Sequence, residues 1–318
     1  MARVCEHRGV RMPSLRRGRK RALAAVLVAG LLVLHALVPN TVGHLGSLVE
    51  TFLPWLGLAI PALLALALWR RSALALVAVL VPAIAWLALF GGHFLPRSDS
   101  RYDLTAVQHN VSDENADPAA TVRDLLEIEP DLVALEEVTP EAVAAYAAAF
   151  PAEYAHHTVQ GTVALWSRFP LAEARAVDIR PAAFGPDWNR GLRATARTPH
   201  GDIAVYVAHL PSMRLGPAGL GSDHRDESAG RLAAAISAEP LDRVILLGDL
   251  NTATGDRALA RLGLTTDDSS FAFSWPARLP VARIDQVMAR AVTVTEVRTL
   301  PRTGSDHLPV AARLRVAG

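Results

Sequence analysis

The sequence has 318 residues, of which 51% are hydrophobic and 20% are charged. This composition excludes a chain that is disordered throughout, because such chains lack the apolar side chains that a core requires. Residues 1–100 carry 11 basic and 3 acidic residues, whereas residues 101–318 carry 21 basic and 28 acidic ones. An acidic second half weighs against a protein that follows nucleic acid by neutralising its phosphates. The single cysteine, Cys5, excludes an intrachain disulfide and a zinc site built from several thiolates.

Three uncharged apolar runs occupy the first third of the chain, at residues 22–39, 51–69 and 72–95. They contain 18, 19 and 24 residues, and a helix needs about 17–25 apolar residues to cross the hydrocarbon core of a bilayer. The first run also resembles the apolar part of a signal peptide. However, no small-x-small cleavage site follows it, and two further apolar runs come after it, which is typical of a retained membrane anchor. The sequence therefore predicts three transmembrane helices within residues 22–95.

Basic residues near these runs predict the orientation of the chain, because the cytoplasmic flanks of transmembrane helices are enriched in lysine and arginine. Residues 1–21 form a leader with five basic side chains near its end, and Arg70 and Arg71 separate the second run from the third. The loop 40–47 has no basic residue. We therefore expect a multi-pass protein of the cell membrane with a cytoplasmic leader and with everything after Leu95 outside the cytoplasm.

Residues 96–102 form a short polar linker, after which the pattern changes. Short β-like runs punctuated by turns alternate with alanine-rich helical stretches, which is typical of an α/β domain. About 215 residues, 103–318, suit one domain with two packed sheets and covering helices. The expected helices are 119–129, 140–150 and 226–238. The expected strands are 104–107, 131–135, 162–166, 193–198, 203–208, 243–247, 286–289, 292–299 and 310–316.

Polar side chains stand at the ends of many of these strands. Each cluster alone is a weak signal, because an Asp-x-Asn after a strand is usually a turn and a lone histidine is usually a satisfied polar residue. Six clusters, each beside an apolar run, indicate a common site, because side chains that leave strands at one rim converge there. The clusters are Gln108-His109-Asn110, Glu136-Glu137, His209, Gly248-Asp249-Leu250-Asn251, Arg283-Ile284-Asp285 and Ser305-Asp306-His307.

In this order, and together with Ser167-Arg168-Phe169-Pro170, the clusters resemble the endonuclease/exonuclease/phosphatase superfamily over roughly residues 103–316. The resemblance implies a four-layer α/β sandwich, in which two central β-sheets are flanked by helices, here preceded by three transmembrane helices. The three-span anchor with an outward catalytic domain is similar to a narrower group, the VanJ-like membrane phosphatases.

The resemblance implies that Asn110, Glu137 and Asp306 bind the metal. Glu137 closes the family's Asp-(aliphatic)-x-x-Leu-Gln-Glu motif, in which this chain has Glu136 where the family has glutamine. This departure adds a negative charge beside the metal site.

The resemblance also implies five catalytic residues. His209 contacts the scissile phosphate, Asp249 holds or activates the attacking water, and Asn251 orients the phosphate. His307 is a phosphate-facing base, and Asp285 accepts a hydrogen bond from it.

The chemistry of these residue types supports the same reading without the family. Carboxylate and amide oxygens suit Mg²⁺ or Mn²⁺ rather than zinc, and such a cation offsets the charge that develops on phosphate oxygens. An aspartate that holds a histidine fixes its tautomer and raises its basicity. Arg190, in the turn Trp188-Asn189-Arg190-Gly191, is a candidate substrate-binding residue because arginine binds phosphate bidentately; an ordinary surface arginine is the alternative.

The loop 211–223 follows His209 directly and contains several glycines together with Met213, Leu215 and Leu220. Two interpretations stay open. The loop is either a mobile surface segment, as tracts rich in glycine and proline usually are, or an apolar lid that dips toward the bilayer beside the active site.

The leading hypothesis is a membrane-anchored, metal-dependent hydrolase of phosphoric esters or anhydrides that acts outside the cytoplasm with Mg²⁺ or Mn²⁺. The VanJ-like resemblance implies a polyprenyl pyrophosphate or another phosphorylated lipid of the cell envelope as substrate, and a link to glycopeptide antibiotic resistance. The expected partners are this lipid and the bilayer, with no nucleic acid and no obligate protein partner. Two alternatives stay open, an extracellular nuclease or phosphodiesterase and a catalytically dead membrane protein that binds a phosphorylated ligand.

Overall fold

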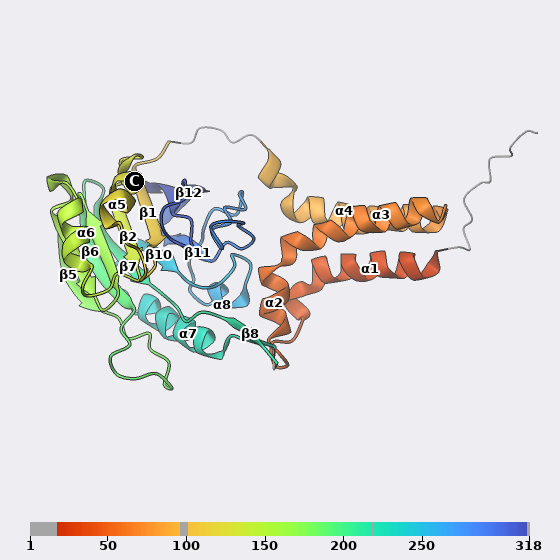
Figure 1. The fold of residues 1–318 in the computed structure, drawn as a ribbon, viewed down its shortest axis with the longest axis horizontal. Coiled ribbons are helices and arrows are strands. Elements are labelled where there is room, and N and C mark those ends of the chain that lie inside the picture. The colour runs from red at the N-terminus through yellow and green to blue at the C-terminus, as the bar shows by residue number, and fades with distance from the viewer. Residues whose placement is uncertain (1–17, 96–100, 218, 317–318) are drawn as a thin grey trace, which may run out of the picture. The chain divides into compact units, whose positions relative to one another are not determined.

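A computed structural model describes residues 18–95, 101–217 and 219–316 (Figure 1). Most of the predicted leader (1–17) and of the predicted linker (96–100) lies outside the described residues. The described residues divide into two compact units. One comprises residues 18–38 and 52–95, and the other comprises Pro39–Thr51 together with residues 101–316.

The first unit is built from apolar helices. Helix α1 (Arg19–Leu34) continues into the 3₁₀ turn η1 (His35–Leu37), and α4 (Ala73–Phe90) continues into η3 (Gly91–Phe94). The two continuous segments, Arg19–Leu37 and Ala73–Phe94, are each long and apolar enough to cross a membrane. Most of their side chains are not buried in the protein, so the apolar surface is available to lipid.

The second apolar run is not the single straight helix that the sequence predicts. It breaks at Phe52, between α2 (Leu45–Thr51) and the 3₁₀ helix η2 (Leu53–Leu58), which leads into α3 (Ala59–Trp69). Pro54 lies in the first turn after the break, where its missing N–H costs no hydrogen bond. The indole nitrogen of Trp86 donates to the Pro54 carbonyl at 2.8 Å. Among the described residues, two helices are thus able to span a membrane, and a third only if the broken pair is one span.

Two β-sheets form the centre of the second unit (Figure 1). One has six strands in the order β12-β13-β1-β2-β4-β3, and the other has five in the order β11-β10-β7-β6-β5. The strands of the first sheet are β1 (Leu104–Asn110), β2 (Leu132–Glu136), β3 (His156–Gln160), β4 (Val163–Ser167), β12 (Val292–Thr299) and β13 (Val310–Val316). The strands of the second are β5 (Leu171–Ala176), β6 (Gly191–Thr198), β7 (Gly201–Ala208), β10 (Val244–Asp249) and β11 (Asp285–Arg290).

Helices cover the outer face of each sheet. Residues of α5 (Pro118–Leu126) and α6 (Val143–Ala149) share an apolar cluster with the first sheet, and residues of α7 (Asp223–Ser237) and α8 (Arg257–Ala260) share one with the second. A third cluster combines side chains of both sheets and forms the layer between them. The predicted fold class, an α/β domain with two sheets flanked by helices, is therefore confirmed.

The burial of both sheet faces explains why the predicted strands are continuous apolar runs rather than alternating ones. In β10, Ile245 and Leu247 point into the core between the sheets. Their neighbours Val244 and Leu246 point into the cluster beneath α7 and α8. Alternate side chains of one strand thus serve two different cores.

The structure also contains elements that the sequence did not predict. Strands β3 and β5 lie at the free edges of the two sheets, and their side chains are largely exposed or half-buried, so no apolar run marks them. The loop 211–223 contains a short hairpin of β8 (Arg214–Gly216) and β9 (Gly219–Gly221). Helix α8 has only 4 residues, and its start is capped by the side chain of Asp256.

Candidate active site

The polar side chains that end the strands meet at one rim of the two sheets. Parallel pairing places Asn110, at the end of β1, beside Glu136, at the end of β2. Antiparallel pairing places Asp249, at the end of β10, opposite Asp285, at the start of β11. Asn110 Nδ2 donates to Asp249 Oδ2 at 3.1 Å, so the rims of the two sheets are in direct contact.

The backbone at this rim adopts conformations that most residues avoid. Glu137 and Asn251 have φ of 61° and 47°, in the left-handed region. Gly248 has φ of 156°, and a Cβ there would overlap the carbonyl of Ala208 in the neighbouring strand. Glycine is therefore required at this position, and the two left-handed residues carry strain of the kind that clusters at functional sites.

His307 and Asp285 form a buried pair. His307 Nδ1 lies 2.8 Å from Asp285 Oδ2, and both side chains are almost completely buried. Burial acts to lower the pKa of His307, but the charges of Asp285 and Asp249 outweigh it and raise that pKa to about 10. The histidine is therefore protonated at neutral pH. This favours phosphate stabilisation over general-base catalysis as its role.

Asp249 has the opposite balance. Burial raises its pKa to about 7, although the charge of His307 acts to lower it. Its Oδ2 lies 3.8 Å from His307 Nε2, and its Oδ1 accepts a hydrogen bond from the backbone N of Asn251 at 2.9 Å. A carboxyl that exchanges its proton near neutral pH is suited to general-base catalysis.

His209 follows β7, and its ring lies beside the guanidinium of Arg190. Arg190 Nη1 lies 3.1 Å from its Nδ1 and 3.3 Å from its Nε2. Burial and then the charge of Arg190 hold the pKa of His209 well below its ordinary value, so this histidine is neutral. Glu137 Oε1 lies 3.7 Å and Asp249 Oδ2 lies 3.6 Å from His209 Nε2. Arg190, half-buried beside the ring of Trp188, thus places a positive charge within the site.

The predicted metal ligands differ in their placement. Asn110 is buried at the rim, the Glu137 side chain is 28% exposed, and Asp306 is exposed. The structure brings Asn110 and Glu137 to the same rim as Asp249, and the charge of Asp306 contributes to the raised pKa of His307.

The donors at this rim fit a hard divalent cation. Asp249, Asp285 and His307 each offer one ligand atom, and these atoms lie within 4.8 Å of one another. Asp285 and His307 already bind each other, which leaves the Glu137 carboxylate and the Asn110 amide beside Asp249 as oxygen donors. Such a set suits Mg²⁺ or Mn²⁺.

Gln108 joins the site, although the sequence alone left it without a role. It is fully buried, and its Nε2 donates to Glu136 Oε2 at 3.0 Å and to Asp285 Oδ1 at 2.8 Å. The alternation of side chains along a strand could have assigned Gln108 to the site, because it lies two residues before Asn110 and therefore on the same face of β1.

Burial opposes the negative charge that the sequence predicts for Glu136. This residue is fully buried, and burial, followed by the charges of Asp285 and Asp249, raises its pKa well above the ordinary value. The shift favours the neutral carboxylic acid, whose shape is close to that of the glutamine in the motif that the sequence resembles.

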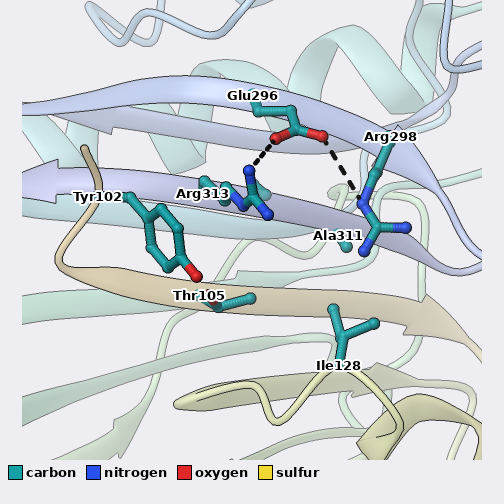
Figure 2. A pocket seen from close by; sticks show the side chains of 8 residues that line it. Tyr102, Thr105, Ile128, Glu296, Arg298, Ala311 and Arg313 are labelled. Carbon is teal, nitrogen blue, oxygen red and sulfur yellow. Dashed lines mark ion pairs between the residues drawn. The ribbon is translucent and has the colours of Figure 1, made fainter. Parts of the chain in front are cut away.

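The pocket in Figure 2 lies elsewhere. It has a volume of about 230 Å³ and lies at the start of β1, around Tyr102 and Thr105. Thr105 and Asn110 occupy opposite faces and opposite ends of this strand. The charged residues of the pocket pair with one another, Glu296 with Arg313 at 3.0 Å and with Arg298 at 3.7 Å. This pocket is therefore separate from the candidate active site.

Residues 107–307 match the family model described as the Endonuclease/Exonuclease/phosphatase family. The chain belongs to this family. The match begins in β1 and ends at His307, so it includes the rim residues described above.

Solved structures with a similar fold include beta toxin from Staphylococcus aureus, with 19% identity and a TM-score of 0.52 over 66% of this chain and 99% of that one. Sphingomyelinase C from Streptomyces griseocarneus has 19% identity and a TM-score of 0.51 over 67% and 99%. A humanized TDP2 from D. rerio has 19% identity and a TM-score of 0.55 over 67% and 99%. At this identity the likeness concerns the fold. No curated protein matches the chain.

We predict a bell-shaped dependence of kcat/KM on pH. The rate should rise as pH passes about 7, where Asp249 loses its proton, and fall as pH approaches 10, where His307 loses its own. A bound cation shifts both limbs to lower pH, because positive charge favours the deprotonated forms. Profiles of the wild type, Asp249→Asn and the exposed control His156→Gln test this: only Asp249→Asn should lose the acid limb. A flat wild-type profile would contradict the assignment.

We also predict that Glu136→Gln keeps most of the turnover. The amide preserves the shape and neutrality of the protonated acid, so kcat should stay within about threefold of the wild type. Glu136→Ala, which leaves Gln108 Nε2 without one acceptor, should lose far more. Equal losses in the two variants, measured beside melting temperatures, would show that Glu136 acts as a charged carboxylate.

Proposed function

We propose that the protein is a membrane-anchored, metal-dependent phosphohydrolase whose active site lies outside the cytoplasm. The observation that carries this proposal is the buried His307–Asp285 pair beside the buried Asp249, at a rim that also holds Glu137 and Arg190. Members of the family are hydrolases of phosphodiester bonds. The apolar helices support the membrane anchor.

The residues of the rim have different roles in the proposed hydrolysis. Asp249 accepts the proton of the water that attacks phosphorus, while the bond from phosphorus to the leaving oxygen breaks and the leaving group departs with that oxygen. His307, oriented by Asp285, donates to the phosphate oxygens, and Arg190 adds a second positive charge beside His209. Glu137 and Asn110 would hold a divalent cation, which would supply positive charge to offset the charge that develops on the phosphate oxygens.

The neutral histidine and Asn251 complete this arrangement. His209 is the neutral donor that faces the Glu137 carboxylate. The Asn251 amide is held by a 2.9 Å hydrogen bond to the carbonyl of Leu210, which fixes its direction for phosphate binding.

As substrate we propose a phosphorylated lipid, with a polyprenyl pyrophosphate of the cell envelope as the leading choice. Apolar side chains near the site support this class. Trp275 and Leu279 are 38% and 71% exposed, and the segment between them hydrogen-bonds to Asp306 through the backbone of Ala277. Leu215, in the hairpin after His209, is 74% exposed. The membership in a VanJ-like group and a role in glycopeptide resistance belong to the same proposal.

A nuclease is the second candidate, because one structure of similar fold is D. rerio TDP2 complexed with a single-strand DNA product. The excess of acidic over basic residues after residue 100 counts against it.

We predict that the purified full-length protein releases inorganic phosphate from a polyprenyl pyrophosphate in the presence of Mg²⁺, and that EDTA abolishes the release. A panel with a phosphoinositide, a nucleotide and single-stranded DNA separates the substrate classes. The kcat of Glu137→Gln should fall about 10²-fold or more, because the substitution removes a carboxylate from the rim but keeps the volume of the side chain. Glu141→Gln, an exposed position four residues away, is the matched control. Activity that survives EDTA would overturn the metal assignment, and turnover of DNA alone would favour the nuclease.

We propose that Leu53–Trp69 is the third span, which places the catalytic unit outside the cytoplasm. Its 6 residues of 3₁₀ helix and 11 of α-helix give a length of about 28 Å, because the 3₁₀ helix rises about 2.0 Å per residue. This approaches the ~30 Å of a hydrocarbon core.

We predict that a reporter enzyme active only outside the cytoplasm works when fused after Gly318 and fails when fused after Arg71. A reporter active only in the cytoplasm should show the reverse. A cytoplasmic Gly318 would contradict both the orientation and the proposed envelope-lipid substrate.

A further inference from the structure

We propose that Pro39–Thr51, the segment between the first two apolar runs, is a docked part of the catalytic unit and positions the loop that follows Asp249 and carries Asn251. The segment groups with the second unit, although the chain before and after it belongs to the first. The expected effect of this segment on turnover rests on the proposed function, whereas its docking on the catalytic unit does not.

Glu50 provides the first docking contact. This residue of α2 is only 4% exposed, and its carboxylate binds Arg257 in a fork, with Nη2 at 2.7 Å and Nε at 3.1 Å from Oε1. The backbone N of Arg257 donates to Oε2 at 3.1 Å. Arg257 is the first residue of α8, so Glu50 also satisfies a backbone N–H that the helix leaves unpaired. Bidentate charged pairs of this kind are among the stronger polar contacts.

Arg225 of α7 provides the second contact. Its side chain is fully buried, and its Nη2 donates to Ser47 Oγ at 3.0 Å while its Nη1 donates to Thr252 Oγ1 at 2.9 Å. Its Nη2 also lies 3.3 Å from Asp256 Oδ2. One guanidinium therefore joins the docked segment to the residue directly after Asn251.

The hairpin β8–β9 provides the third contact. The backbone N of Leu220 donates to the carbonyl of Gly43 at 3.0 Å. Gly219 lies so close to Gly43 that a Cβ would overlap its backbone, and its φ of 106° already disfavours other residues. His44 Nδ1 lies 2.9 Å from Ser222 Oγ, just before α7. The loop after His209 thus packs on the segment through its backbone.

These contacts reach the catalytic loop through Thr252. Its carbonyl accepts a hydrogen bond from Gln286 Nε2 at 2.8 Å, which ties it to β11 next to Asp285. Without Ser47, the buried Arg225 keeps its charge but loses an acceptor, and it can regain one only by moving. Such a movement would displace Thr252 and the neighbouring Asn251.

Cleavage of the linker tests the docking in the full-length chain. A site for a sequence-specific protease is placed within residues 96–102, and the detergent-solubilised protein is held by a tag at its N-terminus. After cleavage, the catalytic fragment should stay on the resin, because Pro39–Thr51 remains with the anchor and still holds it. Glu50→Arg, which opposes Arg257 with a like charge, should release the fragment about tenfold faster or more.

Two variants serve as controls for this experiment. Val42→Arg introduces the same side chain at a position that is 73% exposed and should retain the fragment like the wild type. The double variant Glu50→Arg/Arg257→Glu should restore retention. Immediate release of the wild-type fragment would overturn the docking, and so would equal retention of the wild type and Glu50→Arg.

Ser47→Ala tests the positioning. It should lower kcat roughly 10- to 100-fold with little change in KM, because a displaced catalytic group slows chemistry more than binding. Amide hydrogen exchange at residues 250–256 should accelerate while exchange in β1 stays the same. Unchanged exchange at residues 250–256 would overturn the positioning even if no substrate is known. A wild type that is inactive on the whole panel would instead overturn the proposed function.

The hairpin offers an independent pair of variants. Gly219→Ala, which has no room against Gly43, should release the cleaved fragment faster. Gly216→Ala, in the other strand of the hairpin, meets no atom within 4 Å and should behave like the wild type. Identical behaviour of the two would remove the hairpin from the docking surface.

Discussion

Asp285 is a completely buried carboxylate, and the rim of both sheets is arranged around its charge. His307 binds one of its oxygens and Gln108 the other, and these partners come from the two ends of the catalytic unit, on the side of the first sheet. Together with the bond between Asn110 and Asp249, this carboxylate holds β1, β10, β11 and the turn before β13 together. Removing an ion of this kind from water is costly unless every lone pair finds a donor, so the surrounding residues have little freedom to change.

Burial and nearby charge also shift the pKa values of the two histidines of the site in opposite directions. Both are buried, and burial alone would leave both neutral. His307 faces Asp285 and Asp249 and becomes a stable cation, whereas His209 faces Arg190 and stays neutral. One rim thereby presents a charged and an uncharged imidazole, just as other enzymes separate the roles of two similar groups by their surroundings.

Sequence reasoning found the fold class and the set of rim residues because both depend on local signals. Apolar runs that end in Asn110, Asp249 or the residue before His209 are visible without coordinates, and strand ends of one sheet must meet. The raised pKa of Glu136 could not be predicted, because it comes from burial in the folded protein and then from the charges of Asp285 and Asp249, which lie far away in sequence. The docked segment was missed for the same reason: Glu50 and Arg257 are 207 positions apart, and each alone looks like an ordinary surface charge.

The order of strands in the first sheet has a consequence for how the protein folds during its synthesis. Strand β13, the last described strand, lies between β12 and β1, so the earliest strand of the sheet has no neighbour on that side until β13 is synthesised. The pairing of Leu104 with Leu314 joins residues from the two ends of this unit, and contacts so distant in sequence slow folding. The nascent chain must therefore remain without a finished rim during most of its synthesis. In the orientation that we propose, a transport machinery that moves only unfolded chains would receive it in a suitable state.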